Sequence, residues 1–83
     1  MNPPPFYHIS YYGLLADRRG LAEEGWSHAA ATPAELYAAI LASHPLGLAQ
    51  AALRVAVNDE FVAWDHPLQN GDRIALLPPM SGG

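Results

Sequence analysis

The segment Arg73-Ile74-Ala75-Leu76-Leu77-Pro78-Pro79-Met80-Ser81-Gly82-Gly83 joins an apolar run to a tail that contains prolines and glycines. The run is typical of a strand, and the prolines end it because proline has a fixed φ and no N–H to donate to a sheet. Gly82 and Gly83 have no Cβ, so they can pass through a slot too narrow for a side chain. The segment therefore predicts a final strand whose tail, residues 78–83, enters a partner, unless the tail is an ordinary frayed terminus.

Working outward from this strand, apolar and polar residues alternate in further short stretches, which predicts a strand in each. These stretches are Phe6 to Tyr12, Glu24 to Ala30, Leu53 to Val57 and Phe61 to Ala63. In the first of them Tyr7, Ile9 and Tyr11 share one face, which is expected to be the buried one. Residues 14–20 are expected to form an irregular connection, and residues 48–52 a single helical turn.

One main helix is predicted between Thr32 and His44. The Thr32 side chain can cap its first turn, and Glu35 can reach back to complete a capping box. The helix ends at His44 because the residue before a proline avoids helical angles. Its apolar stripe at helical spacing consists of Leu36, Ala39, Ile40 and Leu41. The order of elements predicts an α+β fold, a mixed sheet of about five strands with this helix packed on one face.

The composition limits the functions open to the chain. Its 83 residues predict a single domain over residues 1–83, with a proline-rich leader at residues 1–5. The absence of cysteine excludes disulfides and thiolate sites, and a net charge of −4 argues against nucleic acid as the main partner. No apolar run is long enough to cross a membrane, and residues 1–5 do not resemble a secretory signal. We therefore expect a cytoplasmic protein.

The sequence does not indicate a self-sufficient active site. The histidines lie far apart in sequence, so no metal site is expected; they are His8, His28, His44 and His66. The adjacent acids Glu23-Glu24 and Asp59-Glu60 point to opposite sides of their strand or hairpin, so neither is a ready acid/base pair. No phosphate-binding or dinucleotide-binding motif is present. The chain is expected to act through a partner.

Alternation along the strands also predicts an exposed apolar cluster near the tail. If Ile9 faces the helix, Tyr12 and Leu77 fall on the opposite face of the sheet, and Phe61 can join them after the hairpin turn. An apolar cluster on an otherwise solvated face is a candidate docking surface. Tyr12, Phe61 and Leu77 are therefore the predicted partner contacts on the sheet.

The second half of the chain also carries a set of motifs at fixed spacing. They are Val57-Asn58-Asp59-Glu60-Phe61-Val62, Asp65-His66-Pro67-Leu68, Asn70-Gly71-Asp72 and Leu77-Pro78-Pro79-Met80-Ser81-Gly82-Gly83. This set resembles the MoaD family, the small subunits of molybdopterin synthase. The resemblance is strongest from Arg54 onward and extends more loosely to Tyr11-Tyr12-Gly13 and the Thr32 helix. It implies the β-grasp fold of ubiquitin, in agreement with the predicted order of elements.

The resemblance also implies a role for the tail. A MoeB-like enzyme would adenylate Gly83 with ATP, and a sulfur donor would convert it to a thiocarboxylate. The tail would then thread Gly82 and Gly83 into a MoaE-like large subunit, where the sulfur passes to a pterin precursor. Further expected contacts with the partner are Pro78, Pro79, Met80 and Ser81. A heterotetramer with the large subunit is implied, and the carrier itself would bind no cofactor.

Two other functions stay open at this point. Another Gly-Gly sulfur carrier, such as the thiazole-forming ThiS, would share the tail but usually lacks the two prolines before it, so Pro78 and Pro79 favour the molybdopterin branch. A ubiquitin-like binding module of a different class would need the apolar sheet face but no activated terminal glycine.

Overall fold

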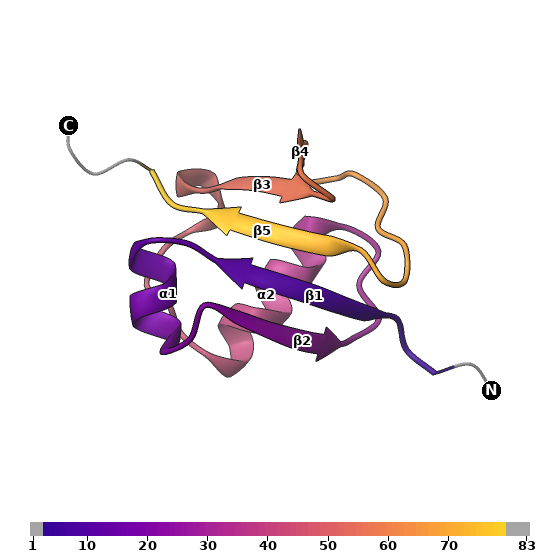
Figure 1. The fold of residues 1–83 in the computed structure, drawn as a ribbon, viewed down its shortest axis with the longest axis horizontal. Helices are drawn as coiled ribbons and strands as arrows, with labels where there is room; N and C mark the ends of the chain where they lie inside the picture. Colours follow the sequence, from indigo (N-terminus) through magenta and orange to yellow (C-terminus); the bar gives the residue numbers. More distant parts are fainter. Residues whose placement is uncertain (1–2, 80–83) are drawn as a thin grey trace.

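The computed structural model describes residues 3–79, so the predicted tail residues Met80, Ser81, Gly82 and Gly83 lie outside the described part. The elements in chain order are β1 (Phe6–Tyr11), α1 (Leu14–Arg19), β2 (Glu23–Ser27), α2 (Pro33–Ser43), the short 3-10 helix η1 (Gln50–Ala52), β3 (Arg54–Val57), β4 (Glu60–Val62) and β5 (Arg73–Leu77). Figure 1 shows the strands side by side with α2 crossing behind them. The predicted α+β architecture is confirmed.

The sheet has the strand order β2-β1-β5-β3-β4. The central strand β5 runs parallel to its neighbour β1, whereas every other neighbouring pair is antiparallel. The sheet is therefore mixed, as expected. The strand that leads into the tail lies in the middle of the sheet, bonded on both sides, so its end is held firmly in place.

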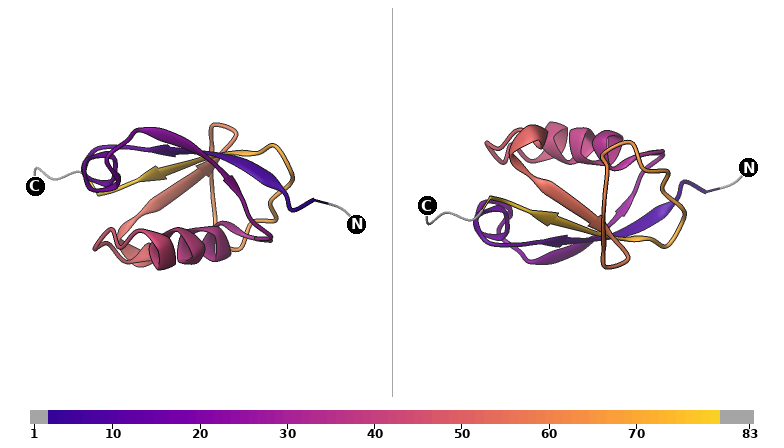
Figure 2. Two further views of the ribbon diagram at one scale, coloured as in Figure 1. Left: turned by 90° about the horizontal axis from the view of Figure 1, so that it is seen from below. Right: turned by 90° about the horizontal axis from the view of Figure 1, so that it is seen from above.

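The sheet and α2 form two layers around one core (Figure 2). The buried residues of β1 and β5 alternate as predicted and belong to the core, whereas Val55, Ala56 and Val57 of β3 are all buried. The largest buried side chains on the sheet side are Tyr7, Ile9, Val55, Ile74 and Leu76. The helix contributes Leu36 and Ile40 as predicted, together with Tyr37, which the predicted stripe did not include. The Tyr37 hydroxyl donates to the Leu48 carbonyl at 2.6 Å, which satisfies its polar end.

The cap of α2 is confirmed with one change. The Thr32 hydroxyl accepts a hydrogen bond from the Glu35 N–H at 3.3 Å. The Glu35 carboxylate, however, accepts from the N–H of Ala31 at 3.0 Å, one residue before the expected partner. The helix ends at His44, whose N–H still donates to the Ile40 carbonyl although its own backbone is extended. The following proline explains this end.

The expectation of an irregular connection over residues 14–20 was wrong, because Leu14–Arg19 form the helix α1. Gly13 precedes this helix with a φ of 54°, and Gly20 ends it in the left-handed region, where its N–H donates to the Ala16 carbonyl. Leu15 is fully buried under the helix. A helix of one and a half turns is too short to produce a recognisable apolar period. The strand expected at residues 24–30 is also shorter and earlier, at Glu23–Ser27.

Candidate functional site

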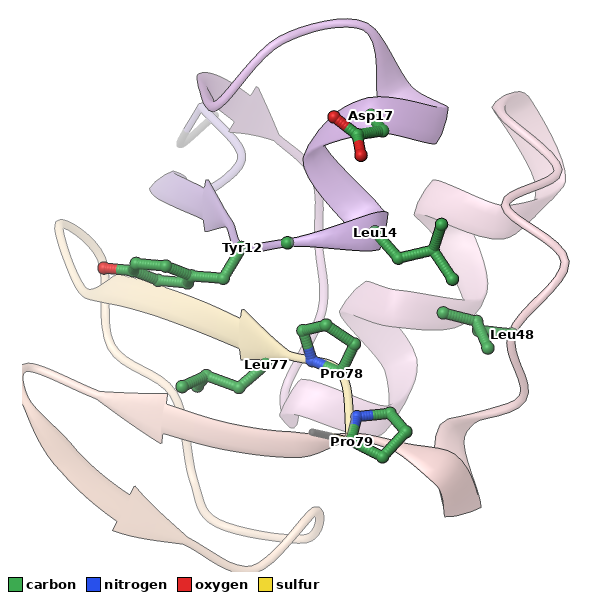
Figure 3. Close-up of a pocket in the computed structure, with 8 residues that line it drawn as sticks. Tyr12, Leu14, Asp17, Leu48, Leu77, Pro78 and Pro79 are labelled. Atoms are coloured by element: carbon green, nitrogen blue, oxygen red, sulfur yellow. The ribbon is translucent and has the colours of Figure 1, made fainter. Parts of the chain in front are cut away.

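A groove opens where β5 ends and the tail begins (Figure 3). It has a volume of about 700 Å³, and we call it the tail-root groove. Its lining residues are Tyr12, Gly13, Leu14, Asp17, Leu48, Leu77, Pro78 and Pro79. Figure 3 shows Leu14 and Leu48 pointing toward each other across the groove, with the two prolines beside them. Most of this lining is apolar, which suits contact with a protein or an apolar ligand.

The chain after β1 supports the root of the tail. The Tyr12 N–H donates to the Leu76 carbonyl at 3.3 Å. The hydrogen bonds between β1 and β5 therefore continue to within two residues of Pro78. A Cβ built on Gly13 would stand 3.4 Å from the Pro78 Cγ, and the positive φ of Gly13 favours glycine there as well. Pro78 therefore packs close to the backbone of Gly13 at the point where the chain leaves the sheet.

The sheet face opposite α2 carries the second part of the site. Because Ile74 and Leu76 face the core, Ala75 and Leu77 lie on this face. The register pairs Leu77 with Arg54, and it pairs Ala56 with both Ala75 and Phe61. We call Ala56, Phe61, Ala75 and Leu77 the apolar strip. Phe61 is 57% exposed, so the strip offers a large side chain to a partner.

The structure brings most of the predicted contact residues together. Those that line the tail-root groove are Tyr12, Leu77, Pro78 and Pro79. Phe61 stands apart on β4, and Arg54 lies between it and Leu77, with its guanidinium carbon 4.0 Å from the centre of the Phe61 ring. Leu77 belongs to both the groove and the strip, so the two parts form a continuous surface.

Sequence reasoning missed the other wall of the groove. Leu14 is 43% exposed on α1, and Leu48 precedes the 3-10 helix. Leu14 fell in the expected connection and Leu48 at the start of the expected helical turn, and neither was assigned to a surface. The sequence signal that could have identified this wall was a leucine, Leu14, directly after the Tyr12-Gly13 pair.

A polar cluster fixes α1 to the sheet behind the groove. The Arg19 guanidinium donates to both Glu24 oxygens, at 2.6 and 2.8 Å, and the Tyr11 hydroxyl donates to Glu24 at 2.5 Å. The side chains of Arg19 and Glu24 are only 17% and 16% exposed. Burial alone would raise the pKa of Glu24, but the hydrogen bonds from Arg19 and Tyr11 outweigh it and lower the pKa to about 2. Burial, together with the bond to Glu24, raises the pKa of Tyr11.

We expect the cluster to make stability depend on pH in the acid range. The Glu24 pKa is about 2 in the folded chain, against an ordinary value of 4.5, so its stabilisation is present above pH 4.5 and is lost as pH falls toward 2. Glu24→Gln should lower the free energy of unfolding at pH 7 by about 2–3 kcal/mol and flatten this pH dependence. Urea unfolding at several pH values measures both effects. The neighbouring exposed acid supplies the control, since Glu23→Gln should change stability by less than about 0.5 kcal/mol.

The remaining titratable residues do not gather into a site. Within residues 3–79, no group of three or more histidines and acids is placed to hold a metal ion. His28 and His44 instead flank the indole of Trp26 in edge contacts, with ring centres 6.4 and 6.3 Å away. No helix in that part of the chain has the length and apolar character needed to cross a membrane.

Comparison with known proteins places these features in context. The model of the ThiS family matches residues 9–83. Over 38 residues the chain is 47% identical to the molybdopterin synthase sulfur carrier subunit of Escherichia coli (strain K12). This match covers 46% of the chain and 47% of that relative, so it spans about half the length of each.

Solved structures extend the likeness over nearly the whole chain. The crystal structure of SAMP1 from Haloferax volcanii has a TM-score of 0.79 and 25% identity, and the match covers 94% of this chain and 99% of that one. The complex of subunits 1 and 2 of the molybdopterin-converting factor from Helicobacter pylori 26695 has a TM-score of 0.66 and 28% identity, with coverage of 94% and 99%. These similarities confirm the β-grasp fold that the sequence predicted.

Proposed function

The chain belongs to the ThiS family, which takes in the MoaD-type carriers that its sequence resembles, and we propose that it is a sulfur carrier that serves as the small subunit of a molybdopterin synthase. The carrier subunit from Escherichia coli supports this branch of the family, and so does the Helicobacter pylori complex of two molybdopterin-converting subunits. The tail sequence Pro78-Pro79-Met80-Ser81-Gly82-Gly83 agrees with it.

The observation that carries the proposal is the continuous surface at the root of the tail. Leu77 ends a central strand, lines the tail-root groove and belongs to the apolar strip. A partner that covers this surface would receive the tail directly, because Pro78 and Pro79 leave from the same place. Six residues can extend about 20 Å from the strand, which is enough to reach a buried reaction centre.

The proposed chemistry takes place on Gly83. A carboxylate is a poor electrophile, so a MoeB-like enzyme first joins it to AMP, using ATP and releasing pyrophosphate. A sulfide-level sulfur nucleophile from a donor then displaces AMP and leaves a thiocarboxylate. The thiocarboxylate sulfur is a nucleophile on a tether, and insertion of the tail replaces a bimolecular encounter with a positioned one.

The partner supplies what the carrier lacks. In this proposal a MoaE-like large subunit holds the pterin precursor and the catalytic groups, and the carrier contributes sulfur and docking surface. The large subunit contacts five residues of the carrier domain, which are Tyr12, Phe61, Leu77, Pro78 and Pro79. The tail residues Met80, Ser81 and Gly82 lie along the path to the reaction centre of the large subunit. The carrier binds no cofactor of its own, acts in the cytoplasm, and assembles with the large subunit as a heterotetramer.

Intact mass spectrometry tests the proposal. After incubation with a MoeB-like enzyme, ATP and a sulfur donor, the carrier should gain the mass difference between sulfur and oxygen, and fragmentation should place the change on Gly83. The same measurement establishes that Gly83 ends the mature chain. A ThiS-type carrier should be run in parallel with its own enzymes as a positive control.

The outcomes separate the candidate functions. A chain that stays unmodified while the positive control is converted would show a binding module without an activated terminus. A thiocarboxylate that a thiazole-forming enzyme accepts, and that a molybdopterin synthase large subunit does not, would assign the chain to the other branch of sulfur carriers.

A further inference from the structure

The arginines of this acidic chain differ in what they contact. Arg18 donates to the Leu46 carbonyl at 2.8 Å, Arg19 pairs with Glu24, and Arg73 pairs with Asp59 at 3.0 Å. Arg54 makes no hydrogen bond through its side chain and no ion pair with any residue in the range 3–79. Its side chain instead lies over an aromatic ring. Arg54 is therefore a cation that the described part of the fold holds in place but does not neutralise.

Arg54 lies within the apolar strip, between Leu77 and Phe61. Its register partner on β5 is Leu77, and its guanidinium lies 4.0 Å from the centre of the Phe61 ring on the other side. It therefore stands inside the exposed surface formed by Leu77 and Phe61, not at its rim. A contact with a ring face occupies none of the N–H groups of a guanidinium in a hydrogen bond, so those of Arg54 can still donate to a partner.

We infer that Arg54 is a specificity-determining contact of this carrier and that it pairs with a carboxylate on the large subunit that receives the tail. This inference rests on the proposed function. Docking over Leu77 and Phe61 would take Arg54 out of water, and an unpaired buried charge is strongly unfavourable. A partner that covers the strip must therefore offer an anion at this point, and one without it is rejected.

A carboxylate is the anion that fits best. Carboxylates accept from the forked N–H groups of arginine in a bidentate geometry that fixes orientation as well as charge. The net charge of −4 argues against nucleic acid as the source of a phosphate. ATP bound by the activating enzyme reacts at Gly83, which an extended tail places up to about 20 Å from the end of β5. With the tail extended, a nucleotide at Gly83 lies beyond the reach of Arg54, which pairs with Leu77 at the end of β5.

The test compares charge-matched variants of the full carrier. Arg54→Gln should raise the Kd for the MoaE-like large subunit of the same organism about tenfold or more, and it should weaken the dependence of Kd on salt. Ala38→Glu changes the net charge by the same unit at an exposed position on α2, on the other side of the sheet, and should leave the Kd within about twofold. Arg54→Lys should fall between the wild type and Arg54→Gln, because lysine keeps the charge but not the planar fork. Isothermal titration at two salt concentrations measures all four proteins.

Each result has a distinct meaning. A Kd for Arg54→Gln equal to that of the wild type, with normal sulfur loading of Gly83, would overturn the role of Arg54 and leave the proposed function standing. Failure of the wild type itself to bind the large subunit would remove both. Urea unfolding should give Arg54→Gln a midpoint close to that of the wild type, because no polar partner within residues 3–79 is lost. A large fall in that midpoint, with affinity restored at low temperature, would show a structural role and also overturn the inference.

Discussion

Adding one alanine after Gly83 should abolish sulfur transfer and leave the domain folded. In the proposed mechanism the activating enzyme and the large subunit both act on a carboxyl group at a fixed distance from Leu77. An extra residue displaces that group by about 3.5 Å and places a methyl group beside it, in a channel expected to admit glycine only. A shift of this size is sufficient to remove most of the rate acceleration that comes from holding the carboxyl group in the right position.

Two measurements check this result. Intact mass should show no sulfur shift at the new terminus, and molybdopterin formation by the reconstituted synthase should fall at least 100-fold. The Kd for the large subunit should change much less, because the groove and the strip remain. The matched control adds one alanine before Pro3, upstream of β1, which begins at the end of the sheet opposite the root of the tail (Figure 1). Normal sulfur transfer by the C-terminally extended chain would contradict the proposed role of Gly83.

The second large effect is expected from Leu77→Glu, which should raise the Kd for the large subunit about 30-fold or more. Leu77 joins the tail-root groove to the apolar strip, so its replacement places a carboxylate at the centre of the proposed contact. The new side chain would also stand beside Arg54 and could neutralise it before the partner arrives. Titration calorimetry with the purified large subunit gives the Kd.

A chemically identical change elsewhere provides the control. Leu21→Glu alters a leucine that is 36% exposed between α1 and β2, outside both the groove and the strip. It should leave the Kd within about twofold, because surface substitutions away from an interface have small effects. If Leu21→Glu and Leu77→Glu weaken binding equally, the loss reflects overall charge and Leu77 is not a contact.

The sequence was sufficient for the parts of the fold that depend on local patterns. Alternation identified the buried face of β1, with Tyr7 and Ile9 on it, and helix-cap chemistry located the start of α2 at Thr32. The hairpin turn expected before Phe61 is also present, with Asn58 and Asp59 both at positive φ. These features depend on neighbours in the chain, which a sequence displays directly.

The features that were missed depend on contacts between distant segments. Helix α1 is stabilised by the burial of Leu15 and by the bond between Arg19 and Glu24. Neither contact can be inferred from the apolar pattern of a segment of only six residues. The groove needs Leu14 and Leu48 to meet, although they are far apart in the chain. The position of Arg54 over Phe61 likewise follows from the register of two strands. Part of the predicted site, from Met80 to Gly83, lies outside the described residues.

The parallel pairing of β1 with β5 has a mechanical consequence. A force that draws the tail out of a partner pulls along β5, toward the end of the strand that carries Pro78. Because β5 is bonded to β1 on one side and to β3 on the other, such a force loads two rows of hydrogen bonds in shear, and many must yield together before the strand slides. An edge strand would unzip one bond at a time. In the proposed mechanism, insertion and withdrawal of the tail would therefore act on the part of the sheet that resists extension best.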